Sequence, residues 1–525
     1  SDLLKIVAKG FVHTRLLELK ERNPNIFIPP SLSSYSHRPI RMVFLRGGRG
    51  GGPLTSAIKD ISIAGRFAQI NIIPGATDDG RSWEEAVEYF SELGIMVTGV
   101  PDIGKSLIDL GNNTVVKSLL EMRIPGKSWK GESVFEEFDA DLIRKGFLSL
   151  CAGRTVNGAL SSIYAYICNL EPRERAEFYS YLDLFAQALS AVELKRQLRF
   201  ARGMLSDEER EKLFYLQRAL RLNREEAWEQ MAHLDLRGIP LRSIVIIAAF
   251  FKVNDWQKAS DLVANYLGVR PGSGVRLASI NRLKAIVLLE DGTLLFSEDE
   301  VNKIPKPAEF SRVFFLDRLL SRQEKTQLCA ADYGGKIKIL KGIEAGSRVR
   351  VYNGTVECIN RADAIVYLPT TIMSNRVTAE AIPEIGRAIG DSKAVKIYFA
   401  NSGLETDPMW TTSQHLIMEY RFASGQQELP YANLDSSRIA RHFNYAVASN
   451  SRIRPDINRY LPIDSGNVSA LGVRLIELDM EQDNPHDPEG KYLSKVMVDV
   501  ILRLIGGPAR SPVPFVSSLA DDCFD

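Results

Sequence analysis

A glycine-rich stretch near the start of the chain separates an apolar strand-like run from a helix-like one. In the segment FLRGGRGGGPLTSAIKD, five glycines occupy six consecutive positions. These positions are Gly47, Gly48, Arg49, Gly50, Gly51 and Gly52. Glycines at such a place let backbone N–H groups approach a phosphate, and the N-terminus of the following helix adds partial positive charge. Because the spacing matches neither GxGxxG nor GxxxxGK[ST], two interpretations stay open, an anion-binding loop and a tight turn.

Two adjacent carboxylates follow the next predicted strand. Asp78 and Asp79 stand in the segment GATDDGRS, directly after the apolar run QINIIP. Carboxylates at the carboxyl end of a strand, beside a phosphate loop, are positioned to hold a divalent cation that bridges a diphosphate. The alternative is an ordinary Asp-Asp-Gly turn. The neighbouring glycine stretch favours the cation site.

Two predicted helix starts carry further polar side chains. The segment PDIGKSLIDLG contains Asp102, Lys105 and Ser106, and Lys105 either neutralises a phosphate or is a solvated lysine of the first turns. The segment GRTVNGALSS contains Arg154 and Asn157. Arginine is suited to a two-pronged grip on phosphate or carboxylate, and helix capping is the open alternative for this second group.

Polar turns also end two later strands. The segment YLPTTIMSN brings Thr370, Thr371 and Ser374 to the end of one apolar run, and FANSGLETDPMW brings Asn401 to the end of the next. Ligands of open parallel sheets bind outside the carboxyl ends of the strands. We therefore expect these four side chains to line a phosphate or nucleotide site.

The elements that must position these residues alternate between strand and helix patterns. Residues 40–74 are typical of a parallel βαβ unit, residues 157–262 have helical spacing, and strand patterns return after Val275. Asp291-Gly292 and Asn353-Gly354 are β-hairpin signals. These patterns predict an α/β domain with an inserted helical subdomain. The predicted divisions are an N-terminal helix and linker (1–37), a first half of the sheet domain (38–165), the helical insertion (166–264), a second half (265–505) and a C-terminal tail (506–525).

Composition limits the classes of partner. The 525 residues include 66 basic and 65 acidic side chains, a net charge of +1, which gives no reason to expect nucleic acid or a membrane surface as a partner. The five cysteines are scattered without metal-ligand spacing, as in reduced intracellular proteins. The longest apolar run, IVIIAAFF, is too short to span a bilayer. We therefore expect a cytoplasmic protein.

Taken in order, these segments resemble the CofD superfamily, which contains the 2-phospho-L-lactate transferases and the YvcK-type gluconeogenesis factors. The segments FLRGGRGGG, ATDDGRS and VPDIGKSL are similar to its GGTGG, ADDGGSSG and PPGDIRNCL motifs, and GRTVNGAL matches its GNL-containing helix start at Asn157. Further along, RADAIVYLPTTIMSN and KIYFANSGLETDPM resemble ADxIVYGPGSLYTS and a K-V-Y-x-x-N…E-T segment. The resemblance covers roughly residues 38–165 and 265–505.

The resemblance implies a Rossmann-like, mostly parallel sheet with helices on both faces that carries a nucleotide diphosphate along its carboxyl edge. It implies a transferase that moves a phospho-acid group from a nucleoside-diphosphate-activated substrate to an acceptor hydroxyl, with loss of the nucleoside monophosphate. Asp78 and Asp79 would hold Mg²⁺ or another divalent cation, act as base, or both. Asp102, Glu405 and Thr406 would bind substrate, and a homodimer is common in the family. The alternative is a non-catalytic regulatory protein that binds a nucleotide or a UDP-sugar.

Three departures from the family motifs bear on this choice. LPTT replaces GPGS, DIGK replaces DIRN, and Arg49 stands where the family has threonine. The first removes two glycines and the second removes an Arg-Asn pair. A divergent member is therefore predicted, whose nucleotide half is better preserved than its acceptor half.

Overall fold

A computed structural model describes most of the sheet domain. The described residues are 40–47, 54–55, 68–77, 83–92, 95–112, 117, 120–121, 240–304, 309–401, 411–450, 461–478 and 494–506. Among them, no helix is both long enough and apolar enough to cross a bilayer.

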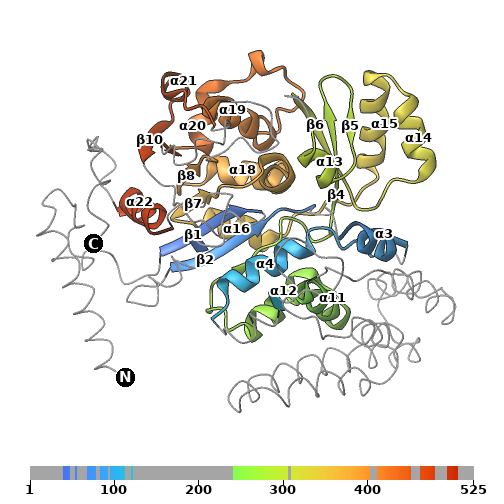
Figure 1. Ribbon diagram of the computed structural model, residues 1–525, viewed down its shortest axis with the longest axis horizontal. Coiled ribbons are helices and arrows are strands. Elements are labelled where there is room, and N and C mark those ends of the chain that lie inside the picture. Colours follow the sequence, from blue (N-terminus) through green and yellow to red (C-terminus); the bar gives the residue numbers. More distant parts are fainter. Residues whose placement is uncertain are drawn as a thin grey trace, which may run out of the picture.

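A seven-stranded sheet forms the centre of the molecule, in the order β10-β9-β8-β7-β1-β2-β3 (Figure 1). Its strands are β1 (Ile40–Arg46), β2 (Ala68–Pro74), β3 (Gly274–Val275), β7 (Ala364–Tyr367), β8 (Val395–Phe399), β9 (Tyr445–Ser449) and β10 (Arg474–Leu478). Every neighbouring pair is parallel. From the centre of the sheet, strands β1 to β3 follow one another toward one edge, and strands β7 to β10 follow one another toward the other. This is a Rossmann-like order, and it confirms the predicted α/β fold class.

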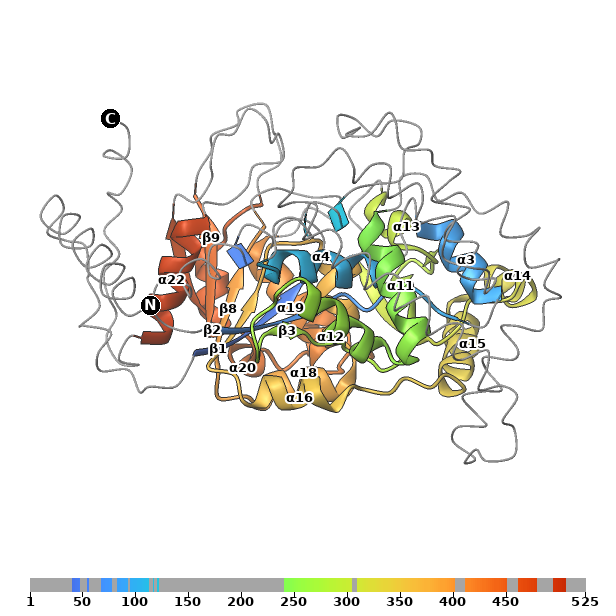
Figure 2. The same cartoon turned by 90° about the horizontal axis from the view of Figure 1, so that it is seen from below.

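Helices cover both faces of this sheet, because its strands are apolar on both sides. In β1, Met42 and Phe44 pack into one core and Val43 and Leu45 into the other. The first face is covered by α3 (Glu84–Glu92), α4 (Val100–Leu110), α11 (Leu241–Val253), α12 (Trp256–Tyr266) and α22 (Ser494–Gly506). In Figure 2, α4, α11 and α12 lie in front of the strands.

The second face is covered by helices that lie between residues 353 and 470. They are α16 (Asn353–Asn360), the π-helix η3 (Ile372–Arg376), α17 (Val377–Glu380), α18 (Pro383–Asp391), α19 (Thr412–Ala423), α20 (Ile439–His442) and α21 (Ser465–Ala470). Two 3₁₀ turns, η4 (Tyr431–Asn433) and η5 (Ser436–Arg438), lie between α19 and α20. This face buries Tyr367, Tyr398 and Phe443.

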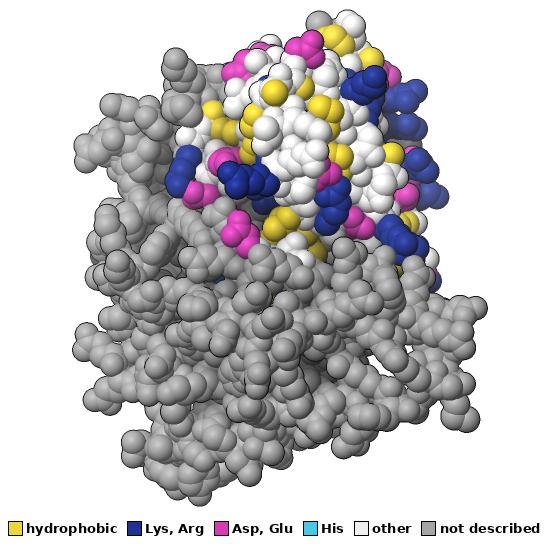
Figure 3. Space-filling view, turned by 90° about the vertical axis from the view of Figure 1, so that its right-hand side faces the viewer, with side chains coloured by type: hydrophobic (Ala, Val, Ile, Leu, Met, Phe, Trp, Pro, Cys, Tyr) yellow, Lys and Arg dark blue, Asp and Glu magenta, His cyan; other side chains and the backbone are white. Residues whose placement is uncertain are grey.

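A lobe projects at one end of the large sheet (Figure 1). Its antiparallel sheet has the order β5-β4-β6 and consists of β4 (Lys284–Leu289), β5 (Leu294–Leu295) and β6 (Phe310–Leu316). Its helices are α13 (Glu298–Asn302), α14 (Arg322–Ala330) and α15 (Tyr333–Ala345). Ile286 and Leu288 face α14 and α15, whereas Val287 and Leu289 join the core of the main body. Figure 3 shows Lys and Arg side chains gathered over the outer surface of this end of the molecule.

One of the two predicted hairpins is confirmed. Gly292 has a φ of 85° in the turn between β4 and β5, so the Asp291-Gly292 prediction is correct. The Asn353-Gly354 prediction is wrong, because these residues begin α16. Thr355 and Ile359, four residues apart, are buried on one face of that helix. Val351, two residues before the helix, forms an isolated bridge to Ser279.

The structure describes only the end of the predicted helical insertion. Residues 240–264 form α11 and most of α12, which pack against α4 in the helical layer of the large sheet. The remainder of 166–264 lies outside the described residues, as do 1–37 and most of the tail 506–525. The division into domains therefore stays a prediction.

Candidate functional site

The candidate site lies where the strand order reverses, between β1 and β7. The carboxyl ends of β1, β2 and β7 share one edge of the sheet, since Arg46 is paired with Pro74 and Leu45 with Tyr367. In an open α/β sheet, the crevice outside this edge is the usual place for a ligand. The glycine stretch leaves β1 at this point.

Two of the predicted loops meet directly here. The Thr370 hydroxyl donates to the Gly47 carbonyl at 2.9 Å, and the Asn401 side-chain amide donates to the Thr370 carbonyl at 3.0 Å. Both side chains are buried. The turns after β1, β7 and β8 are therefore connected, and these hydrogen bonds of Thr370 and Asn401 hold the turns in position.

Gly47 is in contact with a residue that follows the second loop. A Cβ at position 47 would lie 1.7 Å from Asn375 Oδ1 and 2.2 Å from Asn375 Cβ. Asn375 in turn donates to Ser374 Oγ at 3.0 Å. Both belong to η3, a single-turn π-helix of the kind that is frequent at functional sites. Glycine is required at 47 because the η3 turn occupies the space of a side chain.

A buried ion pair between η3 and α19 holds the turn after β7 in position. Arg376 is fully buried, pairs with Glu419 at 2.7 Å, and donates to the Leu368 carbonyl at 2.7 Å and the Tyr398 hydroxyl at 3.1 Å. Burial, with the neighbouring Glu419 charge, raises the pKa of Glu380 well above its ordinary value. Arg376 thus fixes the first carbonyl of the LPTT segment.

A second group of charged residues lies on α4 and at the end of β1, on the face of the sheet opposite to the Arg376–Glu419 pair. Arg46, the last residue of β1, is buried and forms an ion pair with Asp109. Burial and the nearby Arg46 lower the pKa of Lys105 to about 7. Asp102 is buried on the same helix. Cations therefore lie beside the residue from which the glycine stretch begins.

The structure brings together part of the predicted site. Gly47, Thr370 and Asn401 meet at the switch point, and Thr371 and Ser374 belong to the same turn. Asp102, Lys105 and Ser106 lie on α4, where Ser106 is buried. The other predicted residues lie outside the described part of the chain, and they are Gly48, Arg49, Gly50, Gly51, Asp78, Asp79, Arg154, Asn157, Glu405 and Thr406.

Sequence reasoning missed several residues of this region. Asn375 ends the segment YLPTTIMSN and Arg376 directly follows it, and the polar residues around Arg376 gave no signal that its charge is buried. Arg46 follows the apolar run MVFL, and a charged residue at the end of an apolar run was its available signal. No local sequence pattern indicates that Arg376 pairs with Glu419, because Glu419 is 43 residues further along the chain.

The carboxylates of the predicted cation site lie outside the described residues. Within the described ranges, no group of three His, Cys, Asp or Glu side chains is arranged to hold a metal ion. Asp78 and Asp79 are outside those ranges. The preceding segment does lie at the expected edge, since the Gly75 N–H donates to the Arg46 carbonyl at 3.1 Å and the Ala76 N–H to Thr378 Oγ1 at 3.1 Å.

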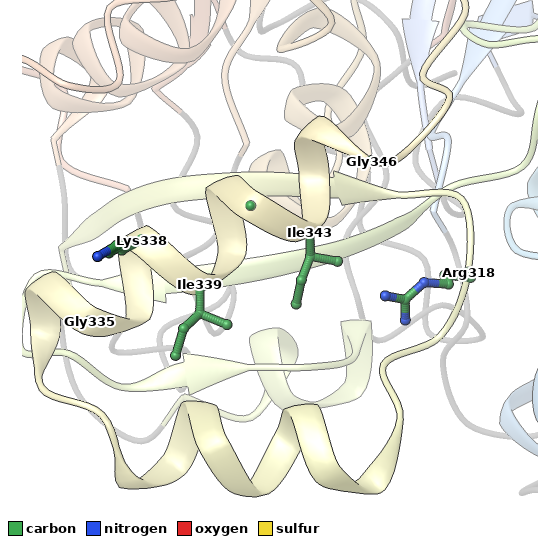
Figure 4. A pocket seen from close by; sticks show the side chains of 7 residues that line it. Arg318, Gly335, Lys338, Ile339, Ile343 and Gly346 are labelled. Atoms are coloured by element: carbon green, nitrogen blue, oxygen red, sulfur yellow. The ribbon is translucent and has the colours of Figure 1, made fainter.

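Two grooves on the described surface lie apart from these residues. One, of about 670 Å³, runs along α15, where Ile339 and Ile343 project from the same side of the helix (Figure 4). The other, of about 380 Å³, lies between α18, α19 and α20. Neither is lined by a residue of the predicted site, so the switch point remains the candidate.

The architecture has a counterpart of known structure. The fold resembles that of protein BH3568 of Bacillus halodurans. One crystal structure of BH3568 aligns with a TM-score of 0.52 and 16% identity over 89% of this chain and 100% of BH3568. Another aligns with a TM-score of 0.52 and 14% identity over 88% of this chain and 99% of BH3568, which is described there as a member of the upf0052 family.

Sequence comparisons add no closer relative. No protein-family model matches the chain, and no curated protein matches it. At 14–16% identity, the likeness to BH3568 establishes a shared fold.

Proposed function

We propose that the chain is a CofD-like protein that binds a nucleoside-diphosphate-activated small molecule at the β1/β7 switch point. The observation that carries the proposal is the meeting of the turns after β1 and β7, where Thr370 is bonded to Gly47. The glycine stretch begins at this point, and its N–H groups are the proposed phosphate ligands. The likeness to a upf0052 protein supports the proposal, since that family is the CofD/YvcK family.

We further propose that the bound group is transferred to an acceptor hydroxyl. The acceptor oxygen forms a bond to the phosphorus of the phospho-acid group, and the bond from this phosphorus to the bridging oxygen of the nucleotide breaks. The nucleoside monophosphate leaves, and the hydroxyl proton passes to Asp78 or Asp79. A divalent cation such as Mg²⁺, held by the same carboxylates, would neutralise charge on the leaving phosphate.

One observation favours a second candidate, a regulatory protein that binds a nucleotide or a UDP-sugar without turnover. Thr370 and Asn401 donate to backbone carbonyls of neighbouring turns. In this arrangement the LPTT turn is held closed against β1, where the family motif has glycines. A turn fixed in this way favours ligand binding without the movements of a catalytic cycle.

The two candidates are separated by assaying turnover. The protein is incubated with GDP- and UDP-linked substrates, Mg²⁺ and a panel of hydroxylated acceptors, and released nucleoside monophosphate is measured by chromatography. Release that Asp79→Asn abolishes supports the transferase. Binding without release supports the regulatory protein, and absence of binding contradicts both. Light scattering of the same samples tests the homodimer that the resemblance implies.

A further inference from the structure

Arg242 crosses α4 at a glycine. A Cβ added at Gly104 would lie 2.9 Å from Arg242 Cγ and 3.0 Å from Arg242 Cδ. The stem of Arg242, which belongs to the first turn of α11, therefore runs over the bare backbone of position 104. A side chain at 104 would displace it.

The position that Arg242 crosses is the one where the family motif differs from this chain. Asp102-Ile103-Gly104-Lys105 stands where CofD-like proteins have Asp-Ile-Arg-Asn. This chain has glycine instead of arginine at that position of α4, and the aliphatic stem of Arg242 from α11 passes over it. The loss of the α4 side chain makes room for the α11 side chain.

Other charged side chains lie near this point on β1 and on α4. Arg46 comes from β1 and is paired with Asp109 of α4, and Lys105 and Asp102 belong to α4 itself. Lys105 is subject to the fields of both arginines and both carboxylates. The start of α11 has neither a side-chain N-cap nor an acidic residue in its first turn, so its N-terminus adds partial positive charge. The cluster adjoins the carboxyl end of β1, from which the glycine stretch begins.

We propose that Arg242 is an anion-binding residue of the switch-point site, supplying from α11 the guanidinium that the DIRN motif carries on α4. The inference rests on the proposed nucleotide-binding function. The ligand class is the diphosphate of the nucleotide, which a guanidinium can bind through two parallel hydrogen bonds. Arg46 and Lys105 flank the same position.

Calorimetric titration with GDP, UDP and inorganic pyrophosphate tests the inference. Arg242→Gln is expected to weaken binding by about tenfold to a hundredfold, the usual effect of losing a charge-assisted hydrogen bond. Arg322→Gln is the matched control, an exposed arginine in the first turn of α14, and is expected to leave affinity unchanged.

A relocated arginine makes the test independent of folding defects. Gly104→Arg alone is expected to weaken binding, because its side chain overlaps the stem of Arg242. Gly104→Arg combined with Arg242→Ala is expected to recover most of the affinity, since one arginine side chain is again present at the contact between α4 and α11. Circular dichroism of each variant monitors folding.

The outcomes distinguish this inference from the proposed function. If the unaltered protein binds the nucleotides and Arg242→Gln binds them equally well, the inference is overturned and the proposed function stands. If Arg242→Gln weakens binding but the double variant does not recover, Arg242 acts through the packing of α11, and the inference is again overturned. If the unaltered protein binds no nucleotide, both are overturned.

Discussion

Gly47 has a close neighbour that the sequence did not reveal. The glycine stretch indicated a close approach to the backbone, and a phosphate was the expected neighbour. At Gly47 the neighbour is Asn375, whose side chain occupies the space of a Cβ. That contact joins residues 328 positions apart, so spacing in the sequence gave no signal of it.

The first residue-scale prediction concerns this contact. Gly47→Ala is expected to lower the free energy of unfolding by about 1–3 kcal/mol, because the added methyl overlaps Asn375 in a packed turn. Denaturant unfolding measures the change. Asn375→Gly in the same chain should restore most of it. Gly342→Ala is the matched control, with open space around the new Cβ, and should be neutral or stabilising by up to ~1 kcal/mol.

The second residue-scale prediction concerns protonation of Lys105. Its pKa is lowered to about 7, by burial first and then by Arg46, so much of the amine is neutral at pH 7.5. A bound anion raises this pKa, so binding takes up a proton and weakens as pH rises through 7. Calorimetry in buffers of different ionisation enthalpy detects the uptake. Lys105→Met should abolish the proton uptake. Lys284→Met is the control, since Lys284 also has a lowered pKa but lies in the lobe, and it should leave the uptake unchanged.

At the scale of elements, the turn from β7 into η3 depends on a distant helix. The apolar run before LPTT predicted the strand, and the polar residues after it predicted a turn at the sheet edge, both correctly. The ion pair that fixes the turn joins η3 to α19 and could not be read locally. The Asn353-Gly354 hairpin failed for a related reason, because packing of α16 against the second face overrides a two-residue turn signal.

The element-scale prediction tests this support. Arg376→Met is expected to cost about 3–5 kcal/mol in the free energy of unfolding, since Glu419 stays buried without its partner. Urea unfolding measures the loss. Arg438→Met is the control, since Arg438 and Asp435 form an exposed pair whose loss should cost at most ~1 kcal/mol. A loss of equal size in both variants would contradict the role given to Arg376.

At the scale of the whole molecule, the alternation of strand and helix patterns was enough for the α/β fold. Parallel strands that are apolar on both faces require helices on both sides, as β1 shows with Phe44 and Leu45 in opposite cores. The antiparallel lobe sheet was visible only as one hairpin. Its third strand, β6, pairs with β4, although β5 and α13 lie between the two strands in the sequence. Local sequence patterns do not specify a pairing at such a distance along the chain.

The whole-molecule prediction concerns acid stability. Burial lowers the pKa of His415 to about 3 and of His442 to about 4. Between those values and the ordinary 6.5, the unfolded chain binds more protons than the folded one, so stability falls as pH falls below 6.5. Each histidine contributes up to ~1.4 kcal/mol per pH unit. His442→Phe keeps an aromatic ring beside Tyr420. This variant should remove the contribution of one histidine to the pH dependence of the free energy of unfolding, measured by denaturant unfolding at pH 4.5–6.5. An unchanged slope would contradict the assignment.

The central claim is that the switch point binds a nucleoside diphosphate. Isothermal titration of the protein with GDP, UDP and UDP-sugars, with and without Mg²⁺, tests it most directly. The proposal predicts saturable binding of at least one of these ligands, strengthened by Mg²⁺ and abolished by Gly48→Val. Absence of binding to all of them, or binding that Gly48→Val leaves intact, would contradict it.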